Sequence, residues 1–264
     1  MQIPVFFELQ AAPHWREVAL LSDVHLQPGE PKTAQAWEKA LASCTADALF
    51  ILGDLFEVWV GDDADNDFER HCLEVLHRCS TQRAVYLMHG NRDFLFGQHA
   101  AQRAGVQLLA DPTVLVWGDT RTLLTHGDAL CVDDLPYQTF RAEVRTDAWQ
   151  TRFLSQPLSE RRALAAAMRA QSESQKKIVD IDRPTAEAWL QAAQASLLIH
   201  GHTHQPCYEK WSDRGKGNAT SQARLVLSDW HADAKTPRLE MVSLRRSTQH
   251  AGALDISRQP LPRA

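Results

Sequence analysis

Five short polar segments, each placed directly after an apolar run, constrain the fold of this chain more than any other feature of its sequence. The apolar runs read as buried strands, and stretches with helical spacing separate them. This alternation is typical of a layered α/β fold, in which ligands bind beyond the carboxyl ends of the strands. We therefore expect the five segments to converge. In chain order they are Asp23-Val24-His25, Gly53-Asp54, Gly90-Asn91, His126-Gly127-Asp128 and Gly201-His202-Thr203-His204.

The composition is that of an ordinary globular protein. The 264 residues suit one large α/β domain or one domain with a substantial insertion, and the net charge of -5 argues against a nucleic-acid partner. Five cysteines without a Cys-x-x-Cys pair indicate reduced thiols rather than a disulfide framework. No stretch approaches the roughly 18 apolar residues of a membrane-spanning helix, and the amino terminus lacks the pattern of a cleaved signal.

The core is expected to consist of buried strands with helices between them. Residues 1–16 read as an extra strand or an arm. Strands are predicted at 18–21, 48–52, 84–88, 196–199, 225–227 and 239–244, with a hairpin formed by 114–117 and 121–124. Helices are predicted at 31–44, 68–76 and 98–104.

Residues 134–194 change character and predict a helical insertion in a core formed by 1–133 and 195–246. The insertion is rich in Ala, Arg, Gln and Leu and carries no strand signal. Its excess of basic side chains, interleaved with large apolar ones, suits a surface that meets an acidic, apolar partner. The alternative is a helical cap that packs and does nothing else. The polar tail, residues 247–264, is expected to be loosely ordered.

The residue types in the five segments indicate a site for two divalent metal ions. Such a pair needs a bridging carboxylate, and Asp54, which follows the central strand, is the natural bridge. Asp23 and His25 with one histidine of the last segment would complete one ligand set. Asn91 and His126 with the other histidine would complete the second. Nitrogen and oxygen ligands without thiolate suit Mn²⁺, with Fe²⁺, Co²⁺ or Zn²⁺ as alternatives and Mg²⁺ disfavoured, and the implied chemistry is phosphoester hydrolysis.

Other polar residues near the segments are expected to lie outside the ligand sets. His200 continues its strand, so its side chain should point away from the histidine two residues later in the loop. His89 and His231 are read as neighbours or as groups that orient a ligand. Asp93 and Asp128 either orient ligand imidazoles or fix their own loops.

The ordered set of segments resembles the calcineurin-like metallophosphoesterases over about residues 17–232. The resemblance implies a four-layer αββα sandwich with a dinuclear metal centre at one edge. By this resemblance metal one takes Asp23, His25, Asp54 and His204, and metal two takes Asp54, Asn91, His126 and His202. The catalytic residues that it implies are Asp54, Asn91, Arg92 and His126.

Most members of that family carry a histidine after Gly-Asn, whereas this chain has Arg92. That arginine, the segments 52–63 and 126–134, and Arg169-Ala170-Gln171-Ser172 resemble the branch that hydrolyses UDP-2,3-diacylglucosamine in lipid A biosynthesis. This implies attack of water on the α-phosphorus, release of UMP and 2,3-diacylglucosamine 1-phosphate, and Mn²⁺ as the metal. It also implies a peripheral location on the cytoplasmic face of the inner membrane.

The substrate contacts implied by the resemblance match this chain unevenly. Those that fit the motif are Asn91, Arg92, Asp134, Ser172 and His202. The segment after Ser172 departs from the branch's pattern, and the candidates for its contacts are Gln175, Lys176 and Lys177. Arg92 offers a bidentate fork to a diphosphate, and apolar side chains of the insertion are expected to line a slot for acyl chains.

Two other functions are compatible with the pattern. Another hydrolase of the same fold, such as a nucleotide-sugar pyrophosphatase or a phosphoprotein phosphatase, would use the same metal centre. Arg92 and the long insertion argue against the phosphatase. A non-catalytic binding module would be expected to have lost ligands, whereas every expected ligand position is filled. The sequence makes no prediction of the oligomeric state.

Overall fold

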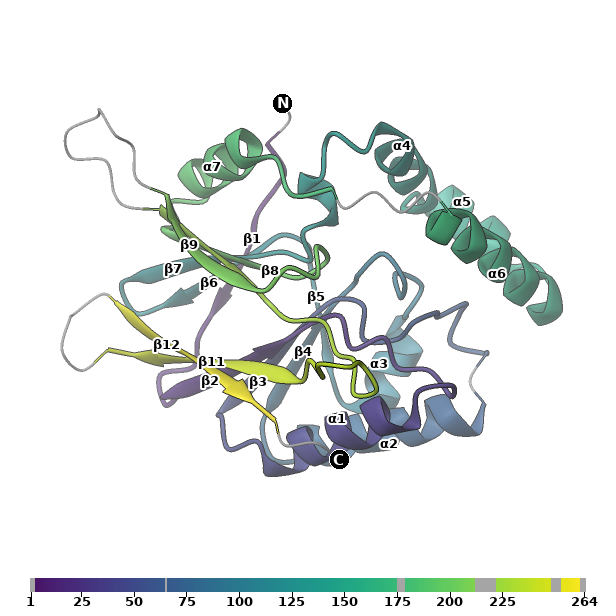
Figure 1. Ribbon diagram of the computed structural model, residues 1–264, viewed down its shortest axis with the longest axis horizontal. Helices are drawn as coiled ribbons and strands as arrows, with labels where there is room; N and C mark the ends of the chain where they lie inside the picture. Colours follow the sequence, from purple (N-terminus) through teal and green to yellow (C-terminus); the bar gives the residue numbers. More distant parts are fainter. Residues whose placement is uncertain (1–2, 65, 175–178, 212–221, 248–252, 262–264) are drawn as a thin grey trace.

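Two six-stranded sheets pack face to face in the computed structural model (Figure 1), which describes residues 3–64, 66–174, 179–211, 222–247 and 253–261. Sheet A runs from edge to edge through β1 (Phe7–Gln10), β6 (Thr113–Trp117), β7 (Thr120–Leu124), β8 (Leu197–His200), β10 (Gln222–Val226) and β9 (Cys207–Trp211). Sheet B runs through β12 (Leu254–Pro260), β11 (Glu240–Arg246), β2 (Glu17–Leu21), β3 (Ala48–Leu52), β4 (Ala84–Met88) and β5 (Gln107–Leu109). The predicted hairpin is β6 and β7, which pair in antiparallel register.

Helices cover the outer face of each sheet. The helices α1 (Pro31–Ser43), α2 (Asp67–Ser80) and α3 (Gln98–Ala104) pack on sheet B, and α7 (Arg183–Ala192) packs on sheet A (Figure 1). Their starts follow from the sequence. A proline opens α1, where its missing N–H costs nothing, and Asn66 with Glu69 forms a capping box at α2. The order helix, sheet, sheet, helix is the predicted αββα sandwich.

The strand β3 shows how an apolar run produces this layering. All five of its residues are buried. Leu49 and Ile51 belong to the apolar cluster that includes residues of α1, α2 and α3, whereas Phe50 and Leu52 belong to the cluster between the two sheets. Successive side chains of a strand point to opposite faces, so a strand covered on both faces has no position for a polar residue until it ends.

The described part of residues 134–194 contains helices, where helices were predicted. They are α4 (Leu135–Val144), α5 (Asp147–Leu154), α6 (Leu158–Ser174) and α7. The first three lie beyond one end of the sheets (Figure 1), and Trp149, Phe153 and Leu158 pack against the cluster of sheet B and its helices. The helix α7 instead belongs to the outer layer on sheet A. The division into a core of 1–133 and 195–246 with an insertion remains a prediction.

The carboxyl-terminal tail was wrongly predicted to be loosely ordered throughout. Leu254–Pro260 forms β12, which pairs antiparallel with β11 at the edge of sheet B. Half-buried Leu254, Ile256 and Arg258 alternate with exposed Asp255 and Ser257. Because one face of this strand meets solvent, its apolar signal is short and easily missed. The amino-terminal stretch does contain an extra strand, β1.

The five cysteines are free thiols, and all except Cys207 are buried. Burial raises the pKa of Cys72 and Cys131 to about 12, which keeps both thiols protonated. No helix within the described part of the chain is long and apolar enough to cross a membrane.

Arg258 of β12 joins the two sheets. Its Nη2 donates to the carbonyl oxygens of Cys207 and Val226, each at 2.8 Å, and both acceptors lie in sheet A. We predict that Arg258→Ala lowers the free energy of unfolding by about 1.5–3 kcal/mol, because two partly buried carbonyls lose a charged donor. Chemical denaturation measures this. The control is Arg78→Ala, which removes an exposed ion pair with Glu38 and should cost at most about 1 kcal/mol; equal losses in the two variants would contradict the role of Arg258.

Candidate metal centre

All five polar segments meet where the carboxyl ends of strands from both sheets come together. From sheet B, Asp23 and His25 follow β2, Asp54 follows β3 and Asn91 follows β4; from sheet A, His126 follows β7, and His202 and His204 follow β8. Parallel pairing of β2, β3 and β4, and of β7 and β8, brings these strand ends to one edge. The predicted convergence is therefore present.

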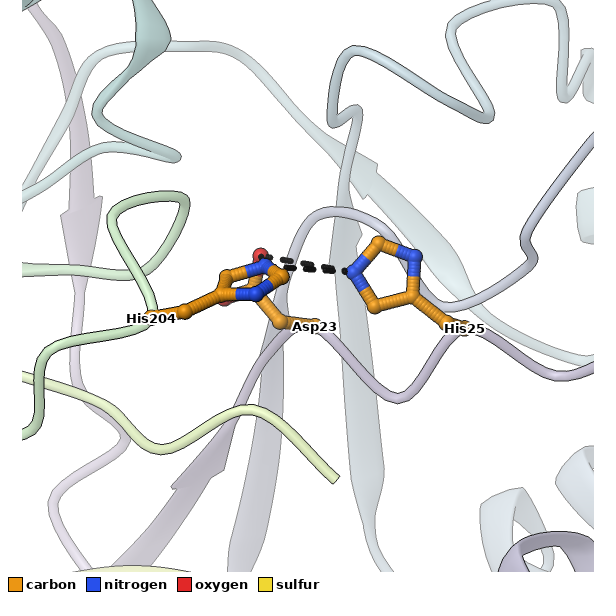
Figure 2. Close-up of side chains that lie close together, drawn as sticks. All are labelled: Asp23, His25 and His204. Carbon is orange, nitrogen blue, oxygen red and sulfur yellow. Dashed lines mark hydrogen bonds and ion pairs between the residues drawn. The ribbon is translucent and has the colours of Figure 1, made fainter. Parts of the chain in front are cut away.

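Three of these side chains form a first group of metal-binding atoms, and Figure 2 shows them pointing toward one another. The Nε2 atoms of His25 and His204 lie 3.3 Å apart, and Nε2 of His204 lies 3.4 Å from Oδ1 of Asp23. Oδ2 of Asp54 approaches Nε2 of His25 to 4.0 Å. Spacings of this size leave room for one cation between these four candidate ligand atoms.

A second group lies on the other side of Asp54. Oδ1 of Asn91 is 3.0 Å from Nε2 of His126 and 2.9 Å from Nδ1 of His202. Oδ2 of Asp54, the atom that faces His25, is also 3.7 Å from Nε2 of His126. One carboxylate oxygen thus faces both groups. The contacts place His204 with the first group and His202 with the second, which is the distribution that the family resemblance implied.

Polar contacts at Nδ1 orient two of the imidazoles for metal binding. Nδ1 of His126 donates to the carbonyl oxygen of Leu52 at 2.9 Å, and Nδ1 of His25 lies 2.8 Å from Oε2 of Glu57. A proton held at Nδ1 leaves the lone pair of Nε2 directed into the centre. With carboxylate and amide oxygens alongside, these donors fit divalent cations such as Mn²⁺ or Zn²⁺.

The backbone of the centre is strained. Five ligand candidates have φ between +51° and +64°, in the left-handed region that side chains other than glycine rarely adopt: Asp23, His25, Asp54, His202 and His204. Such conformations persist only where the surrounding structure enforces them, and they gather at functional sites. Two backbone N–H groups contribute here, because those of Asp23 and His25 donate to the carbonyls of Gly53 and Asp54, each at 3.1 Å.

Two glycines of the motifs allow the segments to approach one another. A Cβ on Gly90 would lie 2.0 Å from Oδ1 of Asp54, and one on Gly53 would lie 2.5 Å from Nδ1 of His126. Neither contact is possible, so a side chain at either position would force the segments apart. The glycines in Gly-Asp and Gly-Asn are therefore required by packing around the carboxylate of Asp54.

Burial and mutual charge set the protonation of the metal-free centre. Burial lowers the pKa of His25, but its hydrogen bond to Glu57 and the charge of Asp54 outweigh this and raise the pKa to about 9. For His126 burial again lowers the pKa, but the charges of Asp54 and Asp23 outweigh this and raise the pKa to about 9. Burial raises the pKa of Asp54 to about 6. Without metal, protons on the imidazoles balance the carboxylates.

Residues 17–206 match the family described as calcineurin-like phosphoesterases. The chain belongs to this family. It is 41% identical over 219 residues to the UDP-2,3-diacylglucosamine hydrolase of Cellvibrio japonicus, covering 80% of this chain and 90% of that protein. It is 40% identical over 222 residues to the protein of the same name from Chromobacterium violaceum, covering 81% and 90% of the two chains.

A solved phosphoesterase from E. coli superposes on 93% of this chain and 100% of its own length, with a TM-score of 0.43 and 14% identity.

Sequence reasoning missed two carboxylates of this calcineurin-like phosphoesterase. Glu57 pairs with His25, and it also lies 3.1 Å from Nε of Arg169 and 3.7 Å from Nη1 of Arg92. Oδ2 of Asp229 lies 3.6 Å from Nδ1 of His204. Glu57, three residues after Asp54, was detectable as an acidic residue in the same loop. Asp229 had no such signal, because only the fold brings it close.

The polar neighbours have other partners. Asp93 accepts hydrogen bonds from the backbone N–H groups of Leu55 and Gly90, so it fixes its own loops. Asp128 pairs with Arg141 of α4. The remaining three lie outside both groups: His200 bonds to Arg224 and the carbonyl of Gly201, His89 to the carbonyl of Phe96, and His231 pairs with Glu30.

The predicted substrate contacts are spread more widely. The backbone N–H of Arg92 donates to Oδ1 of Asp54 at 2.8 Å, which places this arginine beside the centre. Asp134 caps α4 by accepting from the N–H of Tyr137, and its contact with substrate remains a prediction. Ser172 belongs to the last turn of α6. Lys176 and Lys177, like Gln175, fall outside the described residues.

We predict that Mn²⁺ binding to this phosphoesterase releases protons. At pH 7.5 the imidazoles of His25 and His126, whose pKa values are raised to about 9, carry protons that a cation must displace. The apparent affinity should therefore rise with pH up to about 9 and fall as pH decreases. Calorimetry at pH 7.5 in buffers of different ionisation enthalpy should report about two protons per chain. Proton-free binding with a pH-independent affinity would contradict this electrostatic balance.

Proposed function

We propose that this phosphoesterase hydrolyses the pyrophosphate bond of UDP-2,3-diacylglucosamine to UMP and 2,3-diacylglucosamine 1-phosphate, a step of lipid A biosynthesis. The observation that carries the proposal is the identity of about 40% over most of both chains to proteins named UDP-2,3-diacylglucosamine hydrolase. A further protein of that name, from Stenotrophomonas maltophilia, is 39% identical over 237 residues. Two features of the structure support the assignment.

The first supporting feature is Arg92. Its backbone N–H donates a hydrogen bond to the carboxylate of Asp54, and its guanidinium lies 3.7 Å from Glu57, near the centre. A planar guanidinium binds two phosphoryl oxygens at once and keeps its charge at every physiological pH. It therefore suits a diphosphate whose α-phosphorus lies at the metal centre. Asn91 and His202 belong to the second group and are proposed to contact the same phosphoryl group.

The second supporting feature is a cavity of about 330 Å³ between the loop after β3 and the helix α6. Its apolar lining includes Val58, Trp59, Val60, Ala165 and Ala166, and its basic lining consists of Arg162 and Arg169. Arg169 pairs with Glu57, which places this cavity on the side of the first metal group. Apolar walls that also carry two arginines suit an acylated sugar phosphate.

The chemistry follows from the arrangement of the chain's own residues. Two divalent cations, when bound, would neutralise the phosphoryl oxygens and acidify the attacking water. Asp54 would hold both cations through its shared oxygen, with Asp23, His25 and His204 on one side and Asn91, His126 and His202 on the other. Arg92 would orient the α-phosphoryl group and stabilise the charge that develops on it. Mn²⁺ is the proposed metal.

We also propose that the protein contacts the cytoplasmic face of the inner membrane peripherally. Three large apolar side chains of α4, α5 and α6 are exposed: Leu135, Leu154 and Leu164, at 70%, 41% and 40%. They lie on the same helices as several arginines. Exposed apolar residues beside basic ones are typical of surfaces that bind anionic lipids without crossing the bilayer.

Product analysis tests the proposed function. Purified protein with Mn²⁺ should release UMP from UDP-2,3-diacylglucosamine in detergent, and 31P NMR in ¹⁸O-labelled water should place the label on UMP. UDP-glucosamine without acyl chains is the matched substrate and should be cleaved at least about 100-fold less efficiently, because it forfeits the burial of its acyl groups. Equal cleavage of the two would instead indicate a general UDP-sugar pyrophosphatase.

Two variants separate metal binding from catalysis in that assay. Asp54→Ala should abolish turnover and weaken binding of both metals, since it removes the shared ligand. Arg92→Ala should retain both metals and lower kcat by about 10²–10³, the usual effect of removing one charge-stabilising donor. Loss of metal in the Arg92 variant would show that this arginine supports the ligands rather than the phosphoryl group.

A further inference from the structure

A second cavity, of about 280 Å³, has no part in the site described so far. It lies at the carboxyl ends of β4 and β5, beneath α4. Its lining residues are His89, Leu109, Ala110, Asp111, Arg141 and Arg145. Most of these are charged or polar, in contrast to the apolar cavity beside α6.

This cavity adjoins the second metal group. Nη2 of Arg145 donates at 2.7 Å to the carbonyl oxygen of Gly90, the residue before Asn91. Nε of Arg141 donates at 2.8 Å to Asp128, two residues after His126. The apolar cavity, in contrast, adjoins the first group through Arg169 and Glu57. A molecule with its diphosphate at the metals would therefore have one cavity available for each of its two ends.

Asp111 is the unsatisfied group of this cavity. Its side chain is only 8% exposed, and its Oδ1 accepts a hydrogen bond from the hydroxyl of Thr125 at 2.6 Å. Its Oδ2 has no hydrogen-bond donor in the part of the chain that the structure describes; the guanidinium of Arg141 stays 3.8 Å away. Burial and the nearby charge of Asp128 raise the pKa of Asp111. A buried carboxylate oxygen without a donor is costly, so an N–H from a ligand would stabilise it.

The two arginines provide donors on the same walls. A guanidinium has five N–H groups, and the hydrogen bonds described above use only Nε of Arg141 and Nη2 of Arg145. The cavity therefore combines one carboxylate acceptor with two sets of donors. The imide edge of uracil has the complementary order: a carbonyl, an N–H and a second carbonyl. Cytosine has an acceptor in place of that N–H and an amino group in place of one carbonyl, so its order of donors and acceptors does not match the cavity.

We propose, on the basis of the proposed function, that this cavity binds the uracil base of the nucleotide half of the substrate. Asp111 accepts from the imide N–H, and Arg141 and Arg145 donate to the flanking carbonyls. The diphosphate then crosses the metal centre from the second group to the first, and the acylated sugar enters the apolar cavity beside α6. Asp111 is thereby a residue that determines base specificity.

Binding of UMP, CMP and ribose 5-phosphate to the Mn²⁺-loaded protein, measured by calorimetry, tests this proposal. Ribose 5-phosphate keeps the phosphate and sugar but lacks the base. UMP should bind at least about 10-fold more tightly than either of the others, because a site built for a donor between two acceptors rejects ligands without that arrangement. Asp111→Asn, which replaces one acceptor oxygen by an NH₂ donor, should bring UMP to the level of ribose 5-phosphate and leave ribose 5-phosphate unchanged.

Equal binding of UMP and ribose 5-phosphate to the unaltered protein would overturn the proposal, as would undiminished UMP binding by Asp111→Asn. If Asp111→Asn fails to fold or to bind Mn²⁺, a second variant, Ala110→Leu, narrows the cavity. It should give the same selective loss of UMP binding. Unchanged UMP binding by Ala110→Leu would equally overturn the proposal. Cleavage of UDP-2,3-diacylglucosamine with base-independent binding would refute the uracil site alone. Base-dependent binding without cleavage would refute the proposed reaction and leave the uracil site standing.

Discussion

The candidate metal centre depends on one buried carboxylate oxygen, Oδ2 of Asp54, which faces two groups of ligand atoms at once. It lies 4.0 Å from Nε2 of His25 and 3.7 Å from Nε2 of His126. His25 comes from sheet B and His126 from sheet A, so the position of Asp54 is meaningful only while the two sheets hold their packing. The apolar layer between the sheets, to which Phe50 and Leu52 of the preceding strand belong, is therefore also the support of the metal centre.

The conformational cost of the centre is met by the core around it. Left-handed backbone conformation is unfavourable at each of the five ligand candidates that adopt it. Three buried acidic residues that lie close together, Asp23, Asp54 and Asp93, add an electrostatic cost. Fixed hydrogen bonds hold the loops, and the protons on two imidazoles partly balance the charge in the metal-free protein. Bound cations would replace those protons. The strained backbone conformation is thus already present before the cations bind.

The sequence predicted the parts of the fold and site that one segment determines by itself. The strand β3 is buried on both faces, so its sequence is continuously apolar, and the polar motif residues can come only after the strand ends. Features that depend on several segments could not be predicted from the sequence. They are the edge strand β12 with its short apolar alternation, the approach of Asp229 to His204, and the cavity under α4. The metal and substrate roles of individual residues remain predictions, although the contacts group the ligand candidates as the family resemblance implied.

We propose that the five strand-end segments bind two cations that share Asp54. Anomalous diffraction from crystals grown with Mn²⁺ is the measurement to make. We expect two peaks about 3.5–4 Å apart, one on either side of Oδ2 of Asp54, with His25 and His204 at the first and Asn91, His126 and His202 at the second. A single peak, or two peaks of which one does not contact Asp54, would contradict it.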